Sequence, residues 1–368
     1  MKIKLLLLSD PGSIHTIRWA NSLSEKGIEI LVFGFGNYRV KDYLKEIHVI
    51  SEGRRSQGML SKLTYPLSMI RLGKIIHQFC PDIVHAHYAS SYGLLGRLSR
   101  FKPFLISVWG SDIFEFPNFS IFHKQILKSN LQAAVEILST SHVMERETRK
   151  ILLNENPIIK IIPFGIDLKQ FIKKNRHIRN EIVIGTVKTL TFNYGIDILI
   201  EAFFIISTKH PTIDLRLSLA GEGADKKHFV DLVKKYQIQD KVKFLGKIDH
   251  INVPEVLNDF DIFVALSNNE SFGVSVIEAS ACGLPVIVTN VGGLPEVVED
   301  QITGLIVDKG DAQMAASAME ELVLNPVKRA AMGRAGRTRV ERCYDWESNV
   351  NSMVDVYQTL LKSFPPRR

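Results

Sequence analysis

Cysteine is scarce in this chain. Cys80, Cys282 and Cys343 are the three in 368 residues, and no Cys-x-x-Cys or zinc-type spacing occurs. The scarcity excludes a disulfide framework and indicates a reducing compartment, so we expect a cytoplasmic protein. Long apolar runs are also lacking, and no segment is predicted to span a bilayer. The apolar residues 3–9 are too short for a signal peptide and are predicted to form a buried strand.

Two ligand-binding patterns are missing or out of place. No Gly-x-Gly-x-x-Gly follows the first predicted strand, which disfavours a dehydrogenase. Asp259-Phe260-Asp261 matches the Asp-x-Asp motif of metal-dependent transferases. Asp261 is, however, the first residue of a predicted strand, so we expect no bound metal there. No nucleic-acid-binding motif is present either, and no nucleic acid is expected as a partner.

Acidic residues are fewer than basic residues in the first half of the chain. Residues 1–168 hold 21 Lys and Arg against 14 Asp and Glu, whereas the remainder is balanced at 25 of each, so the net charge of +7 lies in the first half. A basic half can attract anionic lipid, and residues 53–79 are predicted as the contact. An ordinary solvated surface, with the apolar side chains packed on their own sheet, is the alternative. The predicted contact residues are Arg54, Arg55, Lys62, Arg71 and Lys74, with Met59, Leu60, Leu63, Leu67, Met69, Ile70 and Leu72.

The length and the apolar pattern predict two α/β domains. Short apolar runs alternate with helical patterns, such as the one over residues 15–26 that ends at Gly27, a natural C-cap. A polar, basic stretch at 169–180 is predicted to be the linker. Parallel sheets are expected on both sides of it, with ligands at the carboxyl ends of the strands. The predicted strands are 3–9, 28–33, 82–87, 104–108 and 135–139, then 182–187, 215–221, 242–246, 262–266 and 286–289.

The most informative stretch runs from Ser267 to Ala279 and contains two glutamates with seven residues between them. Glu270 follows the predicted strand 262–266, and Glu278 is expected about two turns along a helix that begins near Gly273. The N–H groups at the start of that helix favour a phosphate or a sugar oxygen. Carboxylates on both sides of an anion site suit a ligand with hydroxyls at its ends and a diphosphate between them, as in a sugar nucleotide. A solvated helix face is the alternative for a bare pair of glutamates.

The stretch continues through Gly283-Leu284-Pro285 and Gly292-Gly293 to Thr303-Gly304-Leu305. This succession resembles the donor half of the retaining glycosyltransferases of family 4, glycosyl transferases group 1, which have the GT-B fold. The resemblance is strongest over 261–307 and weaker over most of the chain. It implies two doubly wound Rossmann-like domains that face a central cleft. Residues 1–168, with a crossing helix at about 345–363, would bind the acceptor, and residues 169–344 the nucleotide-sugar donor.

The resemblance also implies roles on the donor side. Glu270 would contact sugar hydroxyls, and Glu278 the ribose hydroxyls. The amides of Ser271, Phe272, Gly273 and Val274 would line the sugar and phosphate. A turn at Gly221 would let the backbone approach the nucleotide, and a segment at the end of a strand would contact the base; that segment comprises Phe244, Leu245 and Gly246. For Gly221 and for Gly292-Gly293, a purely structural turn is the alternative.

A cation is required where the leaving phosphate gains charge. Lys188 is the candidate, because it lies in the loop after the first strand of the second domain. Relatives commonly carry an Arg and a further Lys in this loop, and Thr189 and Tyr194 occupy those places here. The resemblance therefore implies a phosphate site with one cation fewer than usual, unless the other domain supplies one.

Four residues are predicted on the acceptor side. Gly12 lies in the loop after the first strand, where its lack of a side chain allows a close approach of substrate. The family often has His-Gly-x-Asp where this chain has Trp109-Gly110-Ser111-Asp112. Trp109 would either line the acceptor pocket or pack inside the domain. Asp112 would either bind a polar group of the substrate or cap a helix. His87 would either face the cleft or form a structural hydrogen bond.

These features predict a retaining, metal-independent glycosyltransferase. It would move a sugar from a nucleoside-diphosphate sugar to a glycan or lipid-linked acceptor, in surface polysaccharide or glycolipid synthesis. No cofactor is expected, and a peripheral position at an anionic membrane surface stays open. The alternatives are a sugar-nucleotide epimerase of the same fold and a non-catalytic relative that binds sugar nucleotides.

Overall fold

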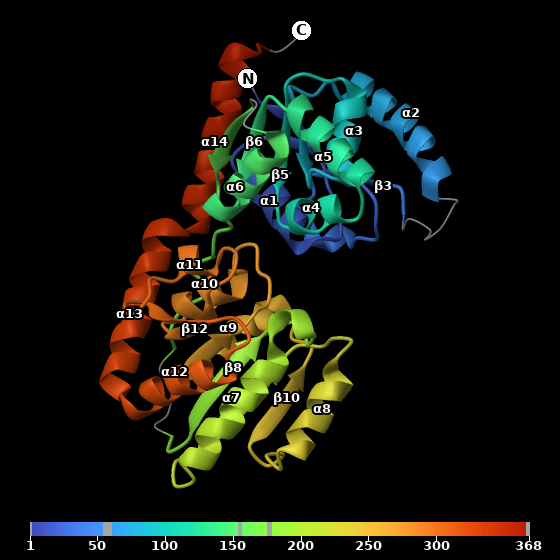
Figure 1. Cartoon of the computed structure of the whole chain (residues 1–368). Coiled ribbons are helices and arrows are strands. Elements are labelled where there is room, and N and C mark those ends of the chain that lie inside the picture. Colours follow the sequence, from blue (N-terminus) through green and yellow to red (C-terminus); the bar gives the residue numbers. More distant parts are fainter. Residues whose placement is uncertain (1, 54–60, 154–156, 175–178, 366–368) are drawn as a thin grey trace. The chain divides into compact units, whose positions relative to one another are not determined.

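The computed structural model describes residues 2–53, 61–153, 157–174 and 179–365, without the side chains of 61–65. The chain divides into two compact units (Figure 1). Unit 1 comprises Met1–Pro163 and Ser348–Arg368, and unit 2 comprises Phe164–Glu347. The divisions therefore fall after residues 163 and 347, where the sequence placed them after 168 and 344.

Unit 1 is built on a seven-stranded parallel sheet of order β3-β2-β1-β4-β5-β6-β7. The order reverses between β1 and β4, so the carboxyl ends of these two strands mark the ligand-binding edge of the sheet. The strands are β1 (Lys4–Leu8), β2 (Glu29–Gly34), β3 (His48–Ser51), β4 (Ile83–His87), β5 (Phe104–Val108), β6 (Glu136–Ser139) and β7 (Ile158–Ile161).

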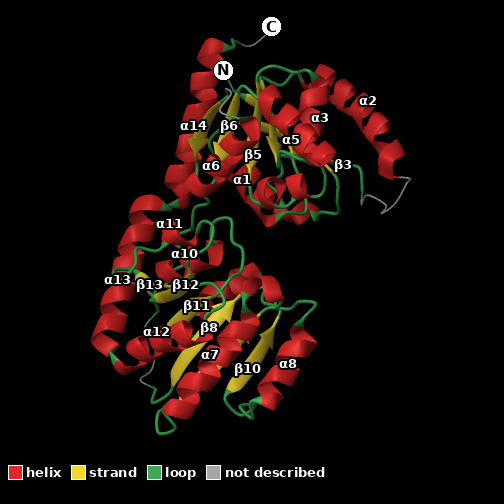
Figure 2. Cartoon of the chain, viewed as in Figure 1, coloured by secondary structure: helices red, strands yellow, loops and turns green. Residues whose placement is uncertain are grey.

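Helices cover both faces of this sheet (Figure 2). Because side chains alternate along a strand, Val84 and Ala86 of β4 face one core and His85 faces the other side. The first core also contains buried residues of α2, α3, α5 and α6, such as Leu72, Leu95 and Leu127. The helices of the unit are α1 (Ile14–Glu25), α2 (Ser61–Phe79), α3 (Ser91–Ser99), α4 (Ser111–Phe114), α5 (Ile121–Ala133), α6 (His142–Leu152) and α14 (Trp346–Ser363).

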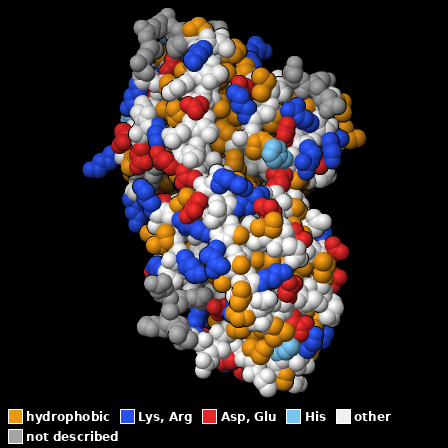
Figure 3. All heavy atoms as spheres, turned by 90° about the vertical axis from the view of Figure 1, so that its left-hand side faces the viewer, with side chains coloured by type: hydrophobic (Ala, Val, Ile, Leu, Met, Phe, Trp, Pro, Cys, Tyr) orange, Lys and Arg blue, Asp and Glu red, His pale blue; other side chains and the backbone are white. Residues whose placement is uncertain are grey.

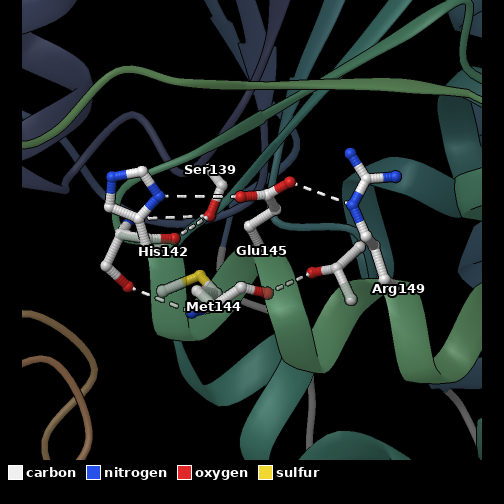
Figure 4. Close-up of polar contacts among 7 residues, drawn as sticks. Ser139, His142, Met144, Glu145 and Arg149 are labelled. Atoms are coloured by element: carbon white, nitrogen blue, oxygen red, sulfur yellow. Dashed lines mark hydrogen bonds and ion pairs between the residues drawn. The ribbon is translucent and has the colours of Figure 1, made fainter.

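Helix α6 shows how local polar contacts start a helix directly at a strand end (Figure 4). The hydroxyl of Ser141 accepts a hydrogen bond from the backbone N–H of Met144 at 3.1 Å, as an N-cap does. Ser139, the last residue of β6, donates its hydroxyl to the carbonyl of Ser141 at 2.8 Å. One turn into the helix, Glu145 accepts from Arg149 at 2.9 Å, a favourable i,i+4 pair. The chain therefore turns from strand to helix within two residues.

The C-terminal helix α14 completes unit 1 on the His85 side of the sheet. Tyr357 is fully buried, and its hydroxyl lies 2.8 Å from Nδ1 of His85. The other ring nitrogen, Nε2, lies 2.9 Å from the hydroxyl of Ser107 on β5. Where the helix enters the unit, the side-chain amide of Asn349 donates to the carbonyl of Pro163 at 2.9 Å. A residue from the end of the chain thus hydrogen-bonds with the centre of the first sheet.

We expect unit 1 to lose stability as the pH falls from 7 to 4. Burial lowers the pKa of His85 to about 3 and holds the pKa of His87 well below its usual value of 6.5. Below pH 6.5 these two histidines therefore become protonated in the unfolded chain while they stay neutral in the folded chain. Each of them makes the free energy of unfolding fall by up to about 1.4 kcal/mol per pH unit. Urea unfolding across this pH range would measure the slope. His85→Gln should flatten it, whereas replacement of the exposed His142 should not; equal slopes in all three proteins would contradict the assignment.

Unit 2 has a six-stranded parallel sheet of order β10-β9-β8-β11-β12-β13. The order reverses between β8 and β11, which again marks the ligand-binding edge. Its strands are β8 (Ile182–Val187), β9 (Leu215–Ala220), β10 (Val242–Gly246), β11 (Ile262–Ala265), β12 (Val286–Thr289) and β13 (Gly304–Val307). Its helices are α7 (Ile196–Lys209), α8 (Lys226–Lys235), α9 (Val253–Asn258), α10 (Val274–Ala281), α11 (Leu294–Val297), α12 (Ala312–Leu324) and α13 (Pro326–Cys343).

The predicted architecture of two doubly wound α/β units is confirmed, and each predicted strand is present to within one or two residues. The helix predicted over 15–26 is also present, and Gly27 follows it with a positive φ of 86°, as a C-cap glycine does. The sequence did not predict the strands β3, β7 and β13. No helix in the described part of the chain is long and apolar enough to cross a membrane.

The predicted lipid-contact segment is only partly accessible in the structure. Arg54 and Arg55 lie outside the described residues, as does the side chain of Lys62. The prediction is wrong for Leu72 and Met69, because α2 packs both against the core of unit 1. Leu67 and Ile70 remain exposed on the same helix. On the face shown in Figure 3, basic and acidic side chains are interspersed rather than gathered by sign.

Candidate functional site

A half-buried ion pair lies at the ligand-binding edge of unit 2. Lys188 directly follows β8, and Glu270 lies in the loop after β11, the neighbouring strand. The Nζ atom of Lys188 is 2.5 Å from Oε2 of Glu270, and the two side chains are only 10% and 13% exposed. The same Nζ lies 4.9 Å from the ring centroid of Tyr194. The lysine is thus fixed between a carboxylate and an aromatic face, where its charge is weakly screened by water.

Glycines hold the Lys188 loop in place. Gly221 has a φ of 143°, and a Cβ there would lie 1.9 Å from the carbonyl oxygen of Lys188. The backbone N–H of Lys188 donates to Ala220 at 3.0 Å, and that of Gly221 donates to Gly246 at 2.8 Å. The close approach that requires Gly221 is therefore to the chain itself. Its predicted contact with a nucleotide stays a prediction.

The Glu270 loop is supported by the Gly292-Gly293 turn. A Cβ on Gly292 would lie 1.7 Å from the carbonyl oxygen of Glu270, and the N–H of Gly293 donates to the same oxygen at 3.0 Å. Gly273, with a φ of 104°, then opens α10. These three glycines place Glu270 just before the start of a helix, whose first N–H groups attract anions.

Glu278 is the fifth residue of α10. The prediction of about two turns is therefore wrong, because only one turn separates Glu278 from the start of the helix at Val274. The residue is 5% exposed, and its Oε1 lies 3.0 Å from Nε2 of His250. His250 follows β10 in a short turn and was not predicted as a site residue; its place after a strand end was the available signal. A second carboxylate is thus held in a fixed position on the helix that follows Glu270.

The remaining donor-side residues differ in accessibility. The ring of Phe272 is buried between Phe164 and Tyr344, with ring centroids 5.9 and 5.7 Å away, so its side chain supports the loop and only its backbone remains for a ligand. Phe244 and Leu245 are half-buried on the edge strand β10, and Phe244 packs against the core. Gly246 ends that strand with a φ of 73°.

The Asp259-Phe260-Asp261 triplet lies at the opposite edge of the sheet. Asp261 precedes β11, and its carboxylate accepts from the N–H of Val183, near the start of β8, at 2.9 Å. The amino ends of parallel strands share one edge, so this triplet is separated from Lys188 and Glu270 by the length of the strands. Within the described ranges, no group of three His, Cys, Asp or Glu side chains is placed to hold a metal ion.

In unit 1, an aromatic cluster occupies the ligand-binding edge. The indole of Trp109, only 7% exposed, lies 4.3 Å from the ring of His87, 5.7 Å from His15 and 5.4 Å from Tyr88 between ring centroids. Nδ1 of His87 lies 3.2 Å from the hydroxyl of Ser9. Of the two roles considered for each, His87 makes a structural hydrogen bond and Trp109 packs. Burial holds the pKa of His87 low, so its imidazole is neutral.

Asp112 and Gly12 shape the loops around this cluster. The buried carboxylate of Asp112 accepts from the backbone N–H groups of Ala89, Trp109 and Gly110 at 2.8, 3.2 and 2.9 Å. It lies inside the first turn of α4, so the expectation that it caps the helix is wrong. Burial raises its pKa, and the three N–H groups oppose that rise. A Cβ on Gly12 would lie 2.4 Å from the carbonyl of Asn37, so the glycine is required by the fold.

Two family models match the chain. The model for glycosyl transferases group 1 matches residues 167–339, and that for glycosyl transferase 4-like proteins matches residues 4–141. N-acetyl-alpha-D-glucosaminyl L-malate synthase of Bacillus anthracis is 26% identical over 98% of both chains. One subunit of the human phosphatidylinositol N-acetylglucosaminyltransferase is 25% identical over 90% of this chain and 72% of its own length.

A solved structure shows the same architecture. HepE of Anabaena in complex with UDP superposes with a TM-score of 0.83 at 19% identity, over 97% of this chain and 100% of that one. The two matched family models together span most of the chain, one on each unit. The chain therefore belongs to the group 1 glycosyltransferases of family 4, and its two units have the GT-B fold.

Proposed function

We propose that the chain transfers a sugar, with retention of configuration, from a nucleoside-diphosphate sugar to a glycan or lipid-linked acceptor. The observation that carries the proposal is the half-buried pair of Lys188 and Glu270 at the reversal of strand order in unit 2. Glu278 lies one helical turn further on. A cation, a helix start and two carboxylates match the groups of a sugar nucleotide in the order diphosphate, sugar and ribose. The UDP complex of the fold relative supports such a donor.

Departure of the nucleoside diphosphate builds negative charge on the leaving phosphate oxygen. Lys188 and the first N–H groups of α10 would stabilise that charge, and both are already in place before the reaction. Glu270 would hold the lysine with one carboxylate oxygen and accept from a sugar hydroxyl with the other. Departure and attack on the same face of the sugar need no protein nucleophile, because the leaving phosphate can take the acceptor proton.

The acceptor would be bound by unit 1. The half-buried rings of His15 and Tyr88 offer edges of the kind that pack against sugars, and the buried rings of His87 and Trp109 support them from below. Gly12 precedes them on the same edge. The human relative's name gives phosphatidylinositol as its acceptor, which supports a lipid-linked acceptor here. Surface polysaccharide or glycolipid synthesis would be the corresponding process.

Transfer is expected to persist in EDTA. In the proposed site, Lys188 and helix α10 supply the positive charge that a divalent ion supplies in metal-dependent transferases. Initial rates with and without an excess of EDTA over any added metal would test this. Loss of activity in EDTA that magnesium or manganese restores would contradict metal independence.

A thermal-shift screen of UDP-, GDP- and ADP-sugars tests the proposed donor. A donor at about 100 times its Kd stabilises the native protein by about 2.7 kcal/mol, which raises Tm by several degrees. Glu278→Ala should reduce the shift by about half or more at the same donor concentration. No shift with any nucleotide sugar would overturn the proposal. Incubation of the donor without acceptor separates the rival epimerase, which would change the sugar's configuration, from a transferase, which would leave it intact.

A further inference from the structure

Unit 1 carries a small apolar projection at the start of α5. Among the large hydrophobic residues that the structure describes, Ile121 and Phe122 are the most exposed, at 87% and 81%. Phe119, two residues before Ile121, is 69% exposed. Three such side chains in four positions are an unusual concentration, since exposed hydrophobic residues elsewhere are mostly single. We call Phe119, Ile121 and Phe122 the apolar tip.

The apolar tip is held rigidly by the fold. Ser120 is the N-cap of α5, and its hydroxyl lies 2.7 Å from Nδ1 of His123. The ring of His123 is 4.9 Å from Phe116 and 5.8 Å from Phe119 between centroids, so the turn before the helix is packed on the helix itself. Further along, Leu127 and Leu131 are fully buried in the core of the unit. The three side chains are therefore presented to solvent by a fixed element.

The segment that contains the apolar tip is basic. No acidic residue occurs in the 20 positions between Glu115 and Glu136, whereas Lys124 and Lys128 lie on α5 itself. Lys124 is exposed one turn after Ser120, and Glu115 is the acidic residue nearest in sequence. A helix start with aromatic and aliphatic side chains followed by lysines has the chemistry of an element that lies in the lipid interface.

We propose that the apolar tip inserts into an anionic lipid surface, with Lys124 at the level of the headgroups. Three side chains are far too few for a stable contact with another protein, which needs about 800 Å² on each partner. A bilayer needs no complementary shape, so a tip of this size suffices for reversible binding when basic residues assist. The inference deepens the proposed function, because it names the surface at which a lipid-linked acceptor would be reached.

Vesicle co-sedimentation of the full chain tests this inference. The wild type should pellet with vesicles of phosphatidylcholine and phosphatidylglycerol, less with phosphatidylcholine alone, and less at high salt. Ile121→Ser/Phe122→Ser should lower the partition coefficient at least about tenfold. Ile251→Ser/Val327→Ser is the matched control, since these two residues of unit 2 are 75% and 76% exposed, and it should bind as the wild type does.

Two further variants locate the contact. In Phe122→Trp, the tryptophan emission should shift to shorter wavelength when anionic vesicles are added. Leu67→Ser/Ile70→Ser, on the exposed side of α2, should retain binding. The proposal is overturned if the wild type stays in the supernatant at low salt, if the Ile121/Phe122 variant pellets equally well, or if the α2 variant carries the loss.

Self-association is measured in parallel. Light scattering that shows a dimer which the Ile121/Phe122 variant abolishes would assign the apolar tip to a second copy of the chain instead of to lipid. The donor thermal shift on the same variants keeps the two hypotheses apart. Vesicle binding without a donor shift would overturn only the proposed function, and a donor shift without vesicle binding would overturn only this inference.

Discussion

Lys188→Ala is expected to lower kcat by about 10²–10³-fold while it changes donor affinity much less. The charge that Lys188 meets is greatest in the transition state, so its removal costs more there than in the ground state. Steady-state kinetics and calorimetric titration of the donor would measure the two effects separately. Equal loss in donor affinity with kcat unchanged would show that Lys188 contributes uniform binding only.

Controls must separate catalysis from stability. The substitution leaves the carboxylate of Glu270, 13% exposed, without its 2.5 Å partner, and an unpaired buried charge destabilises a fold. Lys188→Met/Glu270→Gln removes both charges, so it should melt closer to the wild type than Lys188→Ala does and still fail in transfer. Lys226→Ala is the matched control, because Lys226 pairs with Glu222 at the surface and should leave kcat unchanged.

Glu278→Ala is expected to weaken donor binding by about 10- to 150-fold. The loss corresponds to one charge-assisted hydrogen bond to a ribose hydroxyl, roughly 1.5–3 kcal/mol. Glu278 is suited to this role because its position is fixed by α10 and by His250 at 3.0 Å. Calorimetric titration with the nucleoside diphosphate would measure the change without any acceptor.

Two comparisons make the Glu278 result decisive. Glu278→Gln keeps the shape and one acceptor oxygen, so it should bind the donor more tightly than the alanine variant. Glu255→Ala, on the neighbouring helix α9 with a side chain that is 69% exposed, should bind as the wild type does. An unchanged affinity in a folded Glu278→Ala protein would remove Glu278 from the site.

The interior strands could be predicted because burial on both faces leaves a continuous apolar run. Residues 182–187 and 286–289 were predicted with the bounds that β8 and β12 have. The edge strand β3 reads His48-Val49-Ile50-Ser51 and is mostly half-exposed, so its run is too short and mixed to stand out. The same holds for β7 at the other edge, which includes Lys160.

The site could be predicted only as separate pieces. The sequence placed Lys188 and Glu270 each after a strand, but their contact spans 82 positions and depends on β8 lying beside β11. Strand order is a property of the whole sheet, and no local pattern specifies it. The contact between Glu278 and His250 was missed for the same reason, since it joins α10 to the turn after β10.

Whether a residue packs within the chain or contacts a ligand could be decided only from the three-dimensional structure. A glycine in a loop can allow close approach of a ligand or of another part of the chain, and the sequence does not distinguish these two roles. The 1.9 Å that would separate a Cβ on Gly221 from the carbonyl of Lys188 shows the internal reason for that glycine. Trp109 is a similar case, because its three ring neighbours come from α1 and from the end of β4, both far from it in the sequence.

The hydrogen bond between Tyr357 and His85 has a consequence for synthesis on the ribosome. All strands of unit 1 have been made by residue 161, yet the helix that buries His85 is translated only after the whole of unit 2. Unit 2 is continuous from Phe164 to Glu347, so it has all its residues before unit 1 receives Val350, Met353 and Tyr357. Domains usually fold in the order of their synthesis. Here we expect the second unit of the nascent chain to reach its final form before the first.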